Sequence, residues 1–188
     1  MTIGVLAVQG AFAAHARIFE SLGVATRLIR QPAHLADVNA LVFPGGESTT
    51  MSNVLLSTGL FDPINEMLAS GTPAFGTCAG LILLSSVIDA GRDDQRCFSA
   101  MDCEVLRNGY GRQINSFESE LDVDGLDSPF PAVFIRAPKI VALGDSVEVF
   151  ASVEGQPVYV RQQHVWGTTF HPELTSDHRI HQRFVNHL

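Results

Sequence analysis

Short apolar runs alternate with amphipathic stretches along the first half of the chain. Residues 3–8 are continuously apolar, which is typical of a strand buried on both faces of a sheet. Residues 11–22 instead carry apolar side chains at helical spacing, and Gly23 follows them as a helix stop. The same alternation predicts strands at 24–29, 40–43 and 72–75, and helices at 49–56, 63–69 and 79–88. This order predicts a parallel sheet with helices on both faces.

The second half of the chain consists of shorter strand-like segments separated by turn residues. These segments are 103–107, 119–123, 132–136, 147–152, 158–161 and 165–170, and a closing helix is predicted at 176–187. We expect the strands to be antiparallel additions to the same sheet. No repeat, low-complexity tract or linker interrupts the pattern. The predicted fold class is therefore α/β, with residues 1–188 forming a single three-layer domain around a mostly parallel central sheet.

The composition indicates a globular, acidic protein. Hydrophobic residues make up 46% of the chain and charged residues 17%, which is enough apolar material for a packed core. A net charge of −8 argues against non-specific nucleic-acid binding. No apolar run is long enough to cross a bilayer, and the first one lacks a basic segment before it. We therefore expect a cytoplasmic protein with no membrane or nucleic-acid partner, in which three cysteines form no structural disulfide.

A cysteine lies at the predicted turn between a strand and a helix. The segment FGTCAG, residues 75–80, has Cys78 near its centre, and the small residues around it let the turn close sharply. The helix that starts at Ala79 puts partial positive charge beside the sulfur, which favours the reactive thiolate. These features predict a nucleophile. The alternative is a small, buried cysteine at a tight turn.

A histidine and a glutamate follow the last strand-like segment, two positions apart. Pro172 disfavours a helical conformation at His171, so the chain is expected to stay extended and alternate side chains to point the same way. His171 can then accept the thiol proton on one ring nitrogen and donate to Glu173 from the other, which fixes the tautomer. The alternative is a strand-end histidine beside an exposed glutamate.

A glycine pair follows the third predicted strand, in the segment LVFPGGES of residues 41–48. Paired glycines let backbone N–H groups approach a ligand closely, and such groups can stabilise the oxyanion of an acyl-transfer intermediate. The N–H of Ala79, directly after the nucleophile, would be the second donor. The alternative is an ordinary strand–helix turn. The loop is not a P-loop, because no Lys-Ser/Thr pair follows the glycines.

All three segments stand at predicted strand ends, where open α/β sheets bind their ligands. In combination they resemble the class I (triad) glutamine amidotransferases, which have a flavodoxin-like fold, a similar cysteine elbow and a His-Pro-Glu triplet. Within that class, the chain resembles the family of glutaminase subunits of pyridoxal 5′-phosphate synthase. The segments that carry this closer resemblance are GVL and QG (4–6, 9–10), PGGESTTM (44–51), RNGYGRQINSFE (107–118), FIRAP (134–138), and FHPEL with DHR (170–174, 177–179).

The resemblance implies specific roles for residues in these segments. Cys78, His171 and Glu173 would form the catalytic triad, and Gly46 and Ala79 would form the oxyanion hole. The implied glutamine site consists of Gly46, Glu47, Ser48, Arg107, Ile135 and Arg136. Arginine suits such a site, because its planar pair of donors matches the α-carboxylate of a free amino acid.

The reaction implied by the resemblance is hydrolysis of L-glutamine to L-glutamate and ammonia through a cysteine thioester. The ammonia would pass to a separate synthase (lyase) subunit in a hetero-oligomer, which makes pyridoxal 5′-phosphate from ribose 5-phosphate and glyceraldehyde 3-phosphate. No metal or bound cofactor is implied. Two positions depart from the family pattern: Ala14 stands where a Glu usually precedes His15, and Gln163 stands where a Gly is common.

Other interpretations of the same residues remain open at the sequence level. A different class I glutaminase, such as the one that feeds imidazole glycerol phosphate synthesis, is disfavoured by the segment 107–118. A non-catalytic module of the same fold is disfavoured by the intact triad residues. Chaperones and deglycases with a cysteine elbow are disfavoured by the His-Pro-Glu triplet and the glycine loop. His178 and His181 could share a helix face and bind a metal, but a solvated helix face is the preferred interpretation.

Overall fold

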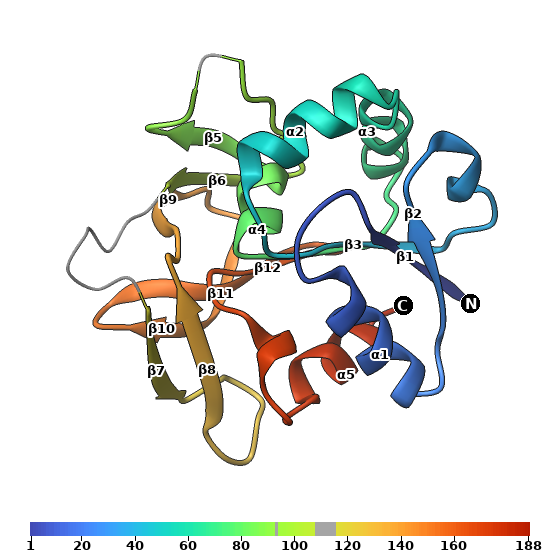
Figure 1. Cartoon of the computed structure of the whole chain (residues 1–188). Coiled ribbons are helices and arrows are strands. Elements are labelled where there is room, and N and C mark those ends of the chain that lie inside the picture. Colours follow the sequence, from blue (N-terminus) through green and yellow to red (C-terminus); the bar gives the residue numbers. More distant parts are fainter. Residues whose placement is uncertain (93, 108–115) are drawn as a thin grey trace.

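Buried apolar strands form the centre of the structure, a seven-stranded sheet with the order β10-β11-β12-β4-β3-β1-β2. The computed structural model describes residues 1–92, 94–107 and 116–188 (Figure 1). The strands of this sheet are β1 (Thr2–Leu6), β2 (Ala25–Ile29), β3 (Ala40–Phe43), β4 (Ala74–Thr77), β10 (Glu148–Val153), β11 (Gln156–Gln162) and β12 (Val165–Thr168). Strands β1 to β4 and β12 pair in parallel, whereas β10 and β11 pair in antiparallel fashion. The predicted α/β class with a mostly parallel sheet is confirmed.

Helices cover both faces of this sheet, as the alternating pattern predicts (Figure 1). One face carries α1 (Phe12–Ser21) and α5 (Arg179–Val185), and the other carries α2 (Ser48–Ser57), α3 (Phe61–Ala69) and α4 (Ala79–Leu84). Each face has its own hydrophobic cluster: Phe19 and Phe184 belong to the first, and Met51, Ile64 and Leu81 to the second. Two short 3₁₀ helices, η1 (Pro32–Leu35) and η2 (Pro172–Leu174), complete the helical elements of the described residues. None of these helices is long and apolar enough to cross a membrane.

Five strands of the second part of the chain lie outside the main sheet. Strands β5 (Ser85–Asp89), β6 (Met101–Leu106) and β9 (Lys139–Leu143) form one small sheet, and β7 (Ser116–Leu121) pairs with β8 (Phe130–Ile135). The expectation of antiparallel additions to the same sheet is therefore correct for β10 and β11 and wrong for β6, β7 and β8. Strand β12 does belong to the main sheet, but it pairs in parallel with β4. The alternation of apolar and polar residues with a period of two determines which face of a strand is buried. This alternation carries no information about which other strand pairs with it.

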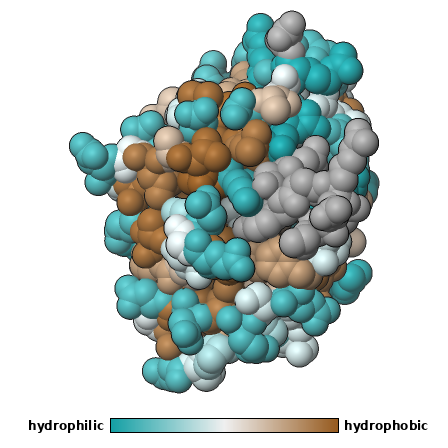
Figure 2. Space-filling view, turned by 90° about the vertical axis from the view of Figure 1, so that its left-hand side faces the viewer, coloured by the Kyte–Doolittle hydropathy of each residue, from teal (hydrophilic) through white to brown (hydrophobic). Residues whose placement is uncertain are grey.

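The three-stranded sheet of β5, β6 and β9 has one face in the core and one toward solvent. Cys103, Val105 and Ile140 are buried in the cluster beneath α2 to α4. Val87 and Val141 point outward and are each 48% exposed. Figure 2 shows apolar surface on this side of the molecule. Alternation along β6 follows the same division, since its residues are buried and more exposed in turn.

The predicted helix at 79–88 is wrong in its second half, because α4 ends at Leu84 and β5 begins at Ser85. The Ser85 hydroxyl donates to the Ile82 carbonyl (2.8 Å), which competes with continuation of the helix. The last helical carbonyls are taken by a distant segment: Phe98 N–H donates to Leu83 O (2.7 Å) and Ala100 N–H to Leu84 O (2.9 Å). An apolar run fits a buried helix and a buried strand equally well, so the sequence does not reveal this switch.

Other boundaries differ by a few residues. Strand β4 runs two residues further than predicted, up to the residue before Cys78, and α5 is shorter than the predicted 176–187. The tight turn between β11 and β12 places Gln163 at φ 53°, a conformation that glycine adopts without a steric penalty. This backbone angle explains why glycine suits the position at which the sequence departs from the pattern of the family that it resembles.

Candidate active site

Cys78 occupies a strained turn between β4 and α4. Its backbone angles are φ 49° and ψ −104°, a conformation that costs a non-glycine residue free energy and is typical of functional sites. Its N–H donates to Thr168 O (2.8 Å), which fixes the turn to the neighbouring strand β12. The turn also requires a glycine, because a Cβ on Gly80 would lie 1.9 Å from Phe43 O. The predicted sharp elbow is present, and Cys78 lines a cavity at the end of the sheet.

His171 and Glu173 form a buried pair beside this elbow. His171 Nδ1 lies 2.8 Å from Glu173 Oε1, and the two residues are 8% and 5% exposed. His171 N–H donates to Val133 O (2.8 Å), which ties the residue to β8. The chain does not stay extended as predicted: Glu173 lies in the 3₁₀ turn η2 that begins at Pro172. The turn, and not strand alternation, brings the two side chains together.

The charges of this pair are strongly coupled to Cys78. Burial disfavours the charged ring of His171, but hydrogen bonds with Cys78 and Glu173 outweigh it and raise its pKa to about 10. Burial also opposes ionisation of Glu173, yet the attraction of His15 and the hydrogen bond from His171 lower the pKa of this carboxyl group. The site thus favours an ionised carboxylate beside a protonated imidazole.

A cavity of about 350 Å³ collects the residues that the sequence analysis singled out. Its lining consists of Gln9, Gly10, Ala11, Gly45, Gly46, Glu47, Ser48, Cys78, Ala79, Ile82, Arg107, Ile135, Arg136, His171 and Leu174. Both residues expected at the oxyanion hole and all six expected around glutamine are among them. Of the described residues in the segment 107–118, Arg107 lines the cavity, and residues 108–115 of that segment lie outside the described residues.

The glycine loop after β3 is packed tightly against its neighbours. A Cβ on Gly45 would lie 2.3 Å from His171 Cε1, so only glycine leaves room for the imidazole. Gly45 O accepts a hydrogen bond from Ala11 N–H (3.0 Å), and Glu47 N–H donates to Gln9 Oε1 (2.8 Å). A trans peptide has its carbonyl and N–H on opposite sides, so the N–H of Gly46 points away from Ala11. Gln9 was not predicted to belong to the site, although it lies in one of the segments that carry the family resemblance.

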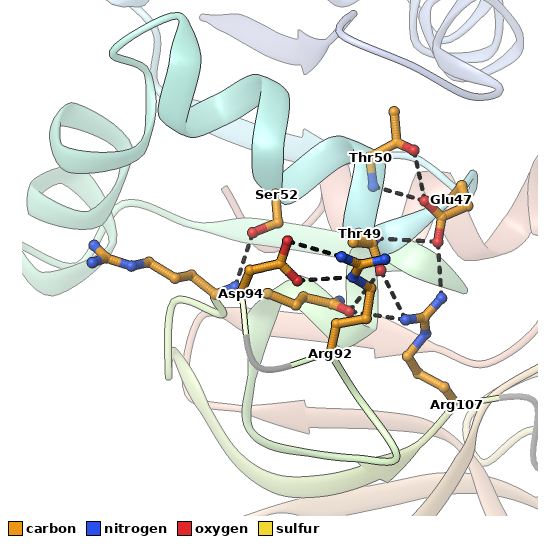
Figure 3. Close-up of polar contacts among 9 residues, drawn as sticks. Glu47, Thr49, Thr50, Ser52, Arg92, Asp94 and Arg107 are labelled. Atoms are coloured by element: carbon orange, nitrogen blue, oxygen red, sulfur yellow. Dashed lines mark hydrogen bonds and ion pairs between the residues drawn. The ribbon is translucent and has the colours of Figure 1, made fainter.

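Glu47 and Arg107 form one side of the cavity through a shared set of polar contacts (Figure 3). Glu47 is the N-cap of α2 and accepts from the N–H groups of Thr49 (3.3 Å) and Thr50 (2.7 Å). Arg107 Nη2 donates to Glu47 Oε1 (2.8 Å), and its Nη1 donates to Thr49 Oγ1 (2.8 Å) and Gln95 Oε1 (3.0 Å). Burial opposes ionisation of Glu47, but the hydrogen bonds from Thr50 and Thr49 and the charge of Arg107 lower its pKa.

The histidines near the end of the chain differ from the expectation. His181 is fully buried and does not lie on a solvated helix face, whereas His178 is the partly exposed N-cap residue of α5. His181 Nε2 lies 2.9 Å from Nδ1 of His15, which is also fully buried. The i, i+3 spacing did not predict this difference. In α5, His181 points toward α1 and the sheet, whereas His178 stands at the N-cap and is partly exposed. Both buried rings were missed as part of the site.

Comparison with known proteins decides which family this site belongs to. A model of the SNO glutamine amidotransferase family matches residues 5–188. The chain belongs to this family. Among its relatives, subunit PdxT of pyridoxal 5′-phosphate synthase from Corynebacterium jeikeium (strain K411) is 48% identical, with 98% of this chain and 95% of that protein covered. The PdxT subunit from Thermosipho africanus (strain TCF52B) is 46% identical, with 99% and 98% covered.

A solved structure agrees with this family assignment. The crystal structure of a glutamine amidotransferase superposes with a TM-score of 0.92 at 42% identity, covering 98% of this chain and 97% of the other. The two chains therefore share one fold over nearly their whole length.

Proposed function

We propose that this amidotransferase hydrolyses L-glutamine to L-glutamate and ammonia as the glutaminase subunit of a pyridoxal 5′-phosphate synthase. One observation carries the proposal: Cys78, on a strained elbow, lines the same cavity as His171, whose Nδ1 is held by Glu173. This is the arrangement that nucleophilic acyl transfer requires. The names of the close relatives support the choice of synthase.

In the proposed first step, the Cys78 thiolate attacks the carboxamide carbon of glutamine. The backbone N–H groups of Gly46 and Ala79 receive the developing oxyanion. His171 donates its proton to the leaving nitrogen, so that ammonia departs and a thioester with Cys78 remains. A pKa of about 10 keeps His171 protonated near neutral pH, which suits a proton donor.

In the second step, His171 takes a proton from water, and the resulting hydroxide attacks the thioester carbonyl. The carbon–sulfur bond breaks, glutamate leaves, and Cys78 returns as the thiolate beside protonated His171. Glu173 stays ionised throughout and orients the imidazole. These steps use only groups of the chain, glutamine and water.

The cavity also offers a way to hold the amino-acid end of glutamine. Arg107 already directs its guanidinium to Glu47, Thr49 and Gln95. We therefore assign the α-carboxylate of glutamine to Arg136, which lines the cavity next to Ile135. In this assignment, the Glu47 carboxylate and the Ser48 hydroxyl accept from the α-ammonium group, and Arg107 holds Glu47 in place through its Nη2 (2.8 Å).

The proposal includes a separate synthase subunit that consumes the ammonia, in a hetero-oligomer in the cytoplasm. We expect low turnover by the isolated chain, because an ammonia producer without an acceptor wastes glutamine. The peptide between Gly45 and Gly46 is the element that docking could reorient, since only the hydrogen bond from Ala11 fixes its carbonyl among the described contacts. Equal turnover with and without the synthase subunit would contradict this part of the proposal.

The decisive experiment measures glutamate release from glutamine by the purified chain, with and without the pyridoxal 5′-phosphate synthase subunit. Cys78→Ala removes the proposed nucleophile, and Cys97→Ala is the matched control at a cysteine that does not line the cavity. We expect turnover that depends on the synthase subunit, is abolished by Cys78→Ala and is unchanged by Cys97→Ala. Turnover that survives Cys78→Ala would exclude the mechanism, and no turnover in any condition would exclude this synthase as the partner.

A further inference from the structure

Two buried histidines from opposite ends of the chain meet directly behind Glu173. His15 belongs to α1 and His181 to α5, and both residues are 0% exposed. His15 Nδ1 lies 2.9 Å from His181 Nε2. On its other side, His15 Nε2 lies 3.4 Å from Glu173 Oε2 and 3.2 Å from Thr77 Oγ1. His15 therefore faces the carboxylate oxygen that does not contact His171, a buried atom that makes no hydrogen bond.

One arrangement of protons satisfies these contacts. An ionised carboxylate attracts an N–H and repels a lone pair, so we place the N–H of His15 on Nε2, where it faces Glu173 Oε2 and donates to Thr77 Oγ1. His15 Nδ1 then accepts, and the proton of the bond between the two rings belongs to His181 Nε2. His181 Nδ1 has no hydrogen-bond partner, and in this arrangement it is an unprotonated acceptor, which is tolerated better than a stranded N–H. Both rings are neutral, and their N–H groups point toward Glu173.

The surroundings of the two rings keep this arrangement in place. Burial lowers the pKa of His15, with Glu173 opposing the shift, and burial lowers the pKa of His181 well below its ordinary value. Phe75 packs edge-on against both rings, at centroid distances of 6.3 Å and 5.7 Å, and Phe19 packs against His181 at 5.2 Å. Water has no access to replace a lost hydrogen bond, so the orientation of each ring depends on the other.

We propose that His15 is a positioning residue of the triad: its Nε2–H, which donates to Thr77 Oγ1, attracts the otherwise unpaired Oε2 of Glu173 from 3.4 Å, so that Oε1 stays directed at His171. His181 acts one step further away by fixing the tautomer of His15. This inference rests on the proposed function, because it assigns His15 and His181 to the support of Glu173. It also connects α5, near the end of the chain, to the chemistry at Cys78.

The experiment combines substitutions with histidine NMR. His15→Leu removes the donor, and His15→Gln places an amide N–H near the position of Nε2. His181→Leu removes the hydrogen bond between His181 Nε2 and His15 Nδ1 that fixes the tautomer of His15. Because this variant keeps His15 itself, it tests the inference even if the His15 variants do not fold. His187→Gln is the control, because His187 is an exposed histidine just beyond α5. Thermal unfolding of each variant identifies those that fold, and each folded variant is assayed for glutamine hydrolysis in the complex with the synthase subunit.

The kinetic expectation is a loss in kcat with little change in KM. For His15→Leu we expect kcat to fall by about tenfold or more, since an unheld carboxylate orients the base poorly. His15→Gln should recover most of that loss, and His181→Leu should show a smaller loss of the same kind. A kcat for His15→Leu within about twofold of wild type, or a His15→Gln as impaired as His15→Leu, would overturn the inference.

The NMR measurement does not depend on activity or on the synthase subunit. In the wild-type chain, ¹⁵N shifts of the rings should report His15 and His181 as neutral, each protonated on Nε2. The Nδ1–H signal of His171, identified by its loss in His171→Gln, should persist in His15→Gln and broaden by solvent exchange in His15→Leu. A charged His15, or a His15 protonated only on Nδ1, would refute the inference even if the enzyme hydrolyses glutamine. If the NMR signals are as expected but the complex does not hydrolyse glutamine, the result would refute the proposed function and leave this inference standing.

Discussion

At the scale of single residues, the cavity concentrates backbone strain and unusual charge. Cys78 and Arg136 both line the cavity and have positive φ angles of 49° and 43°, which residues other than glycine rarely adopt. His171 has a raised pKa because its two partners outweigh its burial. Residues keep such unfavourable backbone angles and shifted pKa values only where surrounding contacts stabilise them. Here, the contacts come from the neighbouring strand β12 and from η2.

Gly45 provides a test of the space around His171. In Gly45→Ala, the new Cβ would lie 2.3 Å from Cε1 and 2.7 Å from Nδ1 of the imidazole, so the ring must move. We expect glutamine hydrolysis to fall by about tenfold or more, because small misplacements of catalytic groups are costly. Gly155→Ala is the control: its φ of 78° predicts a stability loss of about 1 kcal/mol, with kcat unchanged. Wild-type activity in Gly45→Ala would contradict the tight contact.

The raised pKa of His171 predicts a pH dependence of stability with a definite sign. A group with a raised folded-state pKa adds stability that is complete below the unfolded value of 6.5 and is lost as pH rises through about 10. We therefore expect the difference in unfolding free energy between wild type and His171→Gln to shrink from pH 6.5 to pH 10. Urea unfolding of both chains across this range measures it. A difference that grows with pH would show that the folded site favours the neutral imidazole.

At the scale of elements, the site depends on which strands lie side by side. Strand β12 pairs in parallel with β4, so that Thr168 lies opposite Thr77 and the chain leaves both strands at the same edge. This pairing brings His171 next to Cys78 across about half of the sequence. A second element, α2, contributes its N-terminus, where Glu47 both caps the helix and receives Arg107.

The cap of α2 can be tested separately from catalysis. Glu47→Ala leaves the N–H groups of Thr49 and Thr50 without their side-chain acceptor. We expect the free energy of unfolding to fall by about 1 kcal/mol, the usual cost of a lost N-cap. Glu66→Ala, at an exposed glutamate of α3, is the matched control and should change stability by less than about 0.5 kcal/mol. Equal effects in urea unfolding would indicate that Glu47 is not an effective cap.

At the scale of the whole molecule, the three sheets share two hydrophobic clusters. Strands β6 and β9 bury residues in the cluster of α2 to α4, whereas β7 and β8 bury theirs in the cluster of α1 and α5. Neither small sheet has a core of its own among the described residues. We therefore keep the prediction that residues 1–188 form a single domain, which should unfold as one cooperative unit.

This prediction is checked by comparing two probes of urea unfolding. Trp166 is the single tryptophan, is 1% exposed and stacks on Phe150, so its fluorescence reports the main-sheet core. Far-UV circular dichroism reports the helices and all strands together. We expect the two transitions to coincide, because both small sheets lose their packing partners when the main sheet unfolds. A separate early transition by circular dichroism would show that a small sheet unfolds independently.

The sequence alone determined the features that depend on local pattern. Apolar periodicity defined the alternating strands and helices of the first half, and small residues around Cys78 predicted the elbow. The motifs around Cys78, His171 and Gly46, together with the other segments that resemble the family, were sufficient to anticipate the family and many of the residues that line the cavity. These features are readable because neighbours in the chain decide them: a period, a turn or a cap involves only a few consecutive residues.

Tertiary structure alone decided which distant segments meet. Three features depend on partners far along the chain. They are the division of the second-half strands among three sheets, the end of α4 at Leu84, and the contact of Arg107 with the cap of α2. The same is true of His181, which its i, i+3 spacing from His178 made look solvated, and of His15, because packing buries both behind Glu173. Burial and pairing arise from the packing of whole elements, so no local pattern specifies them.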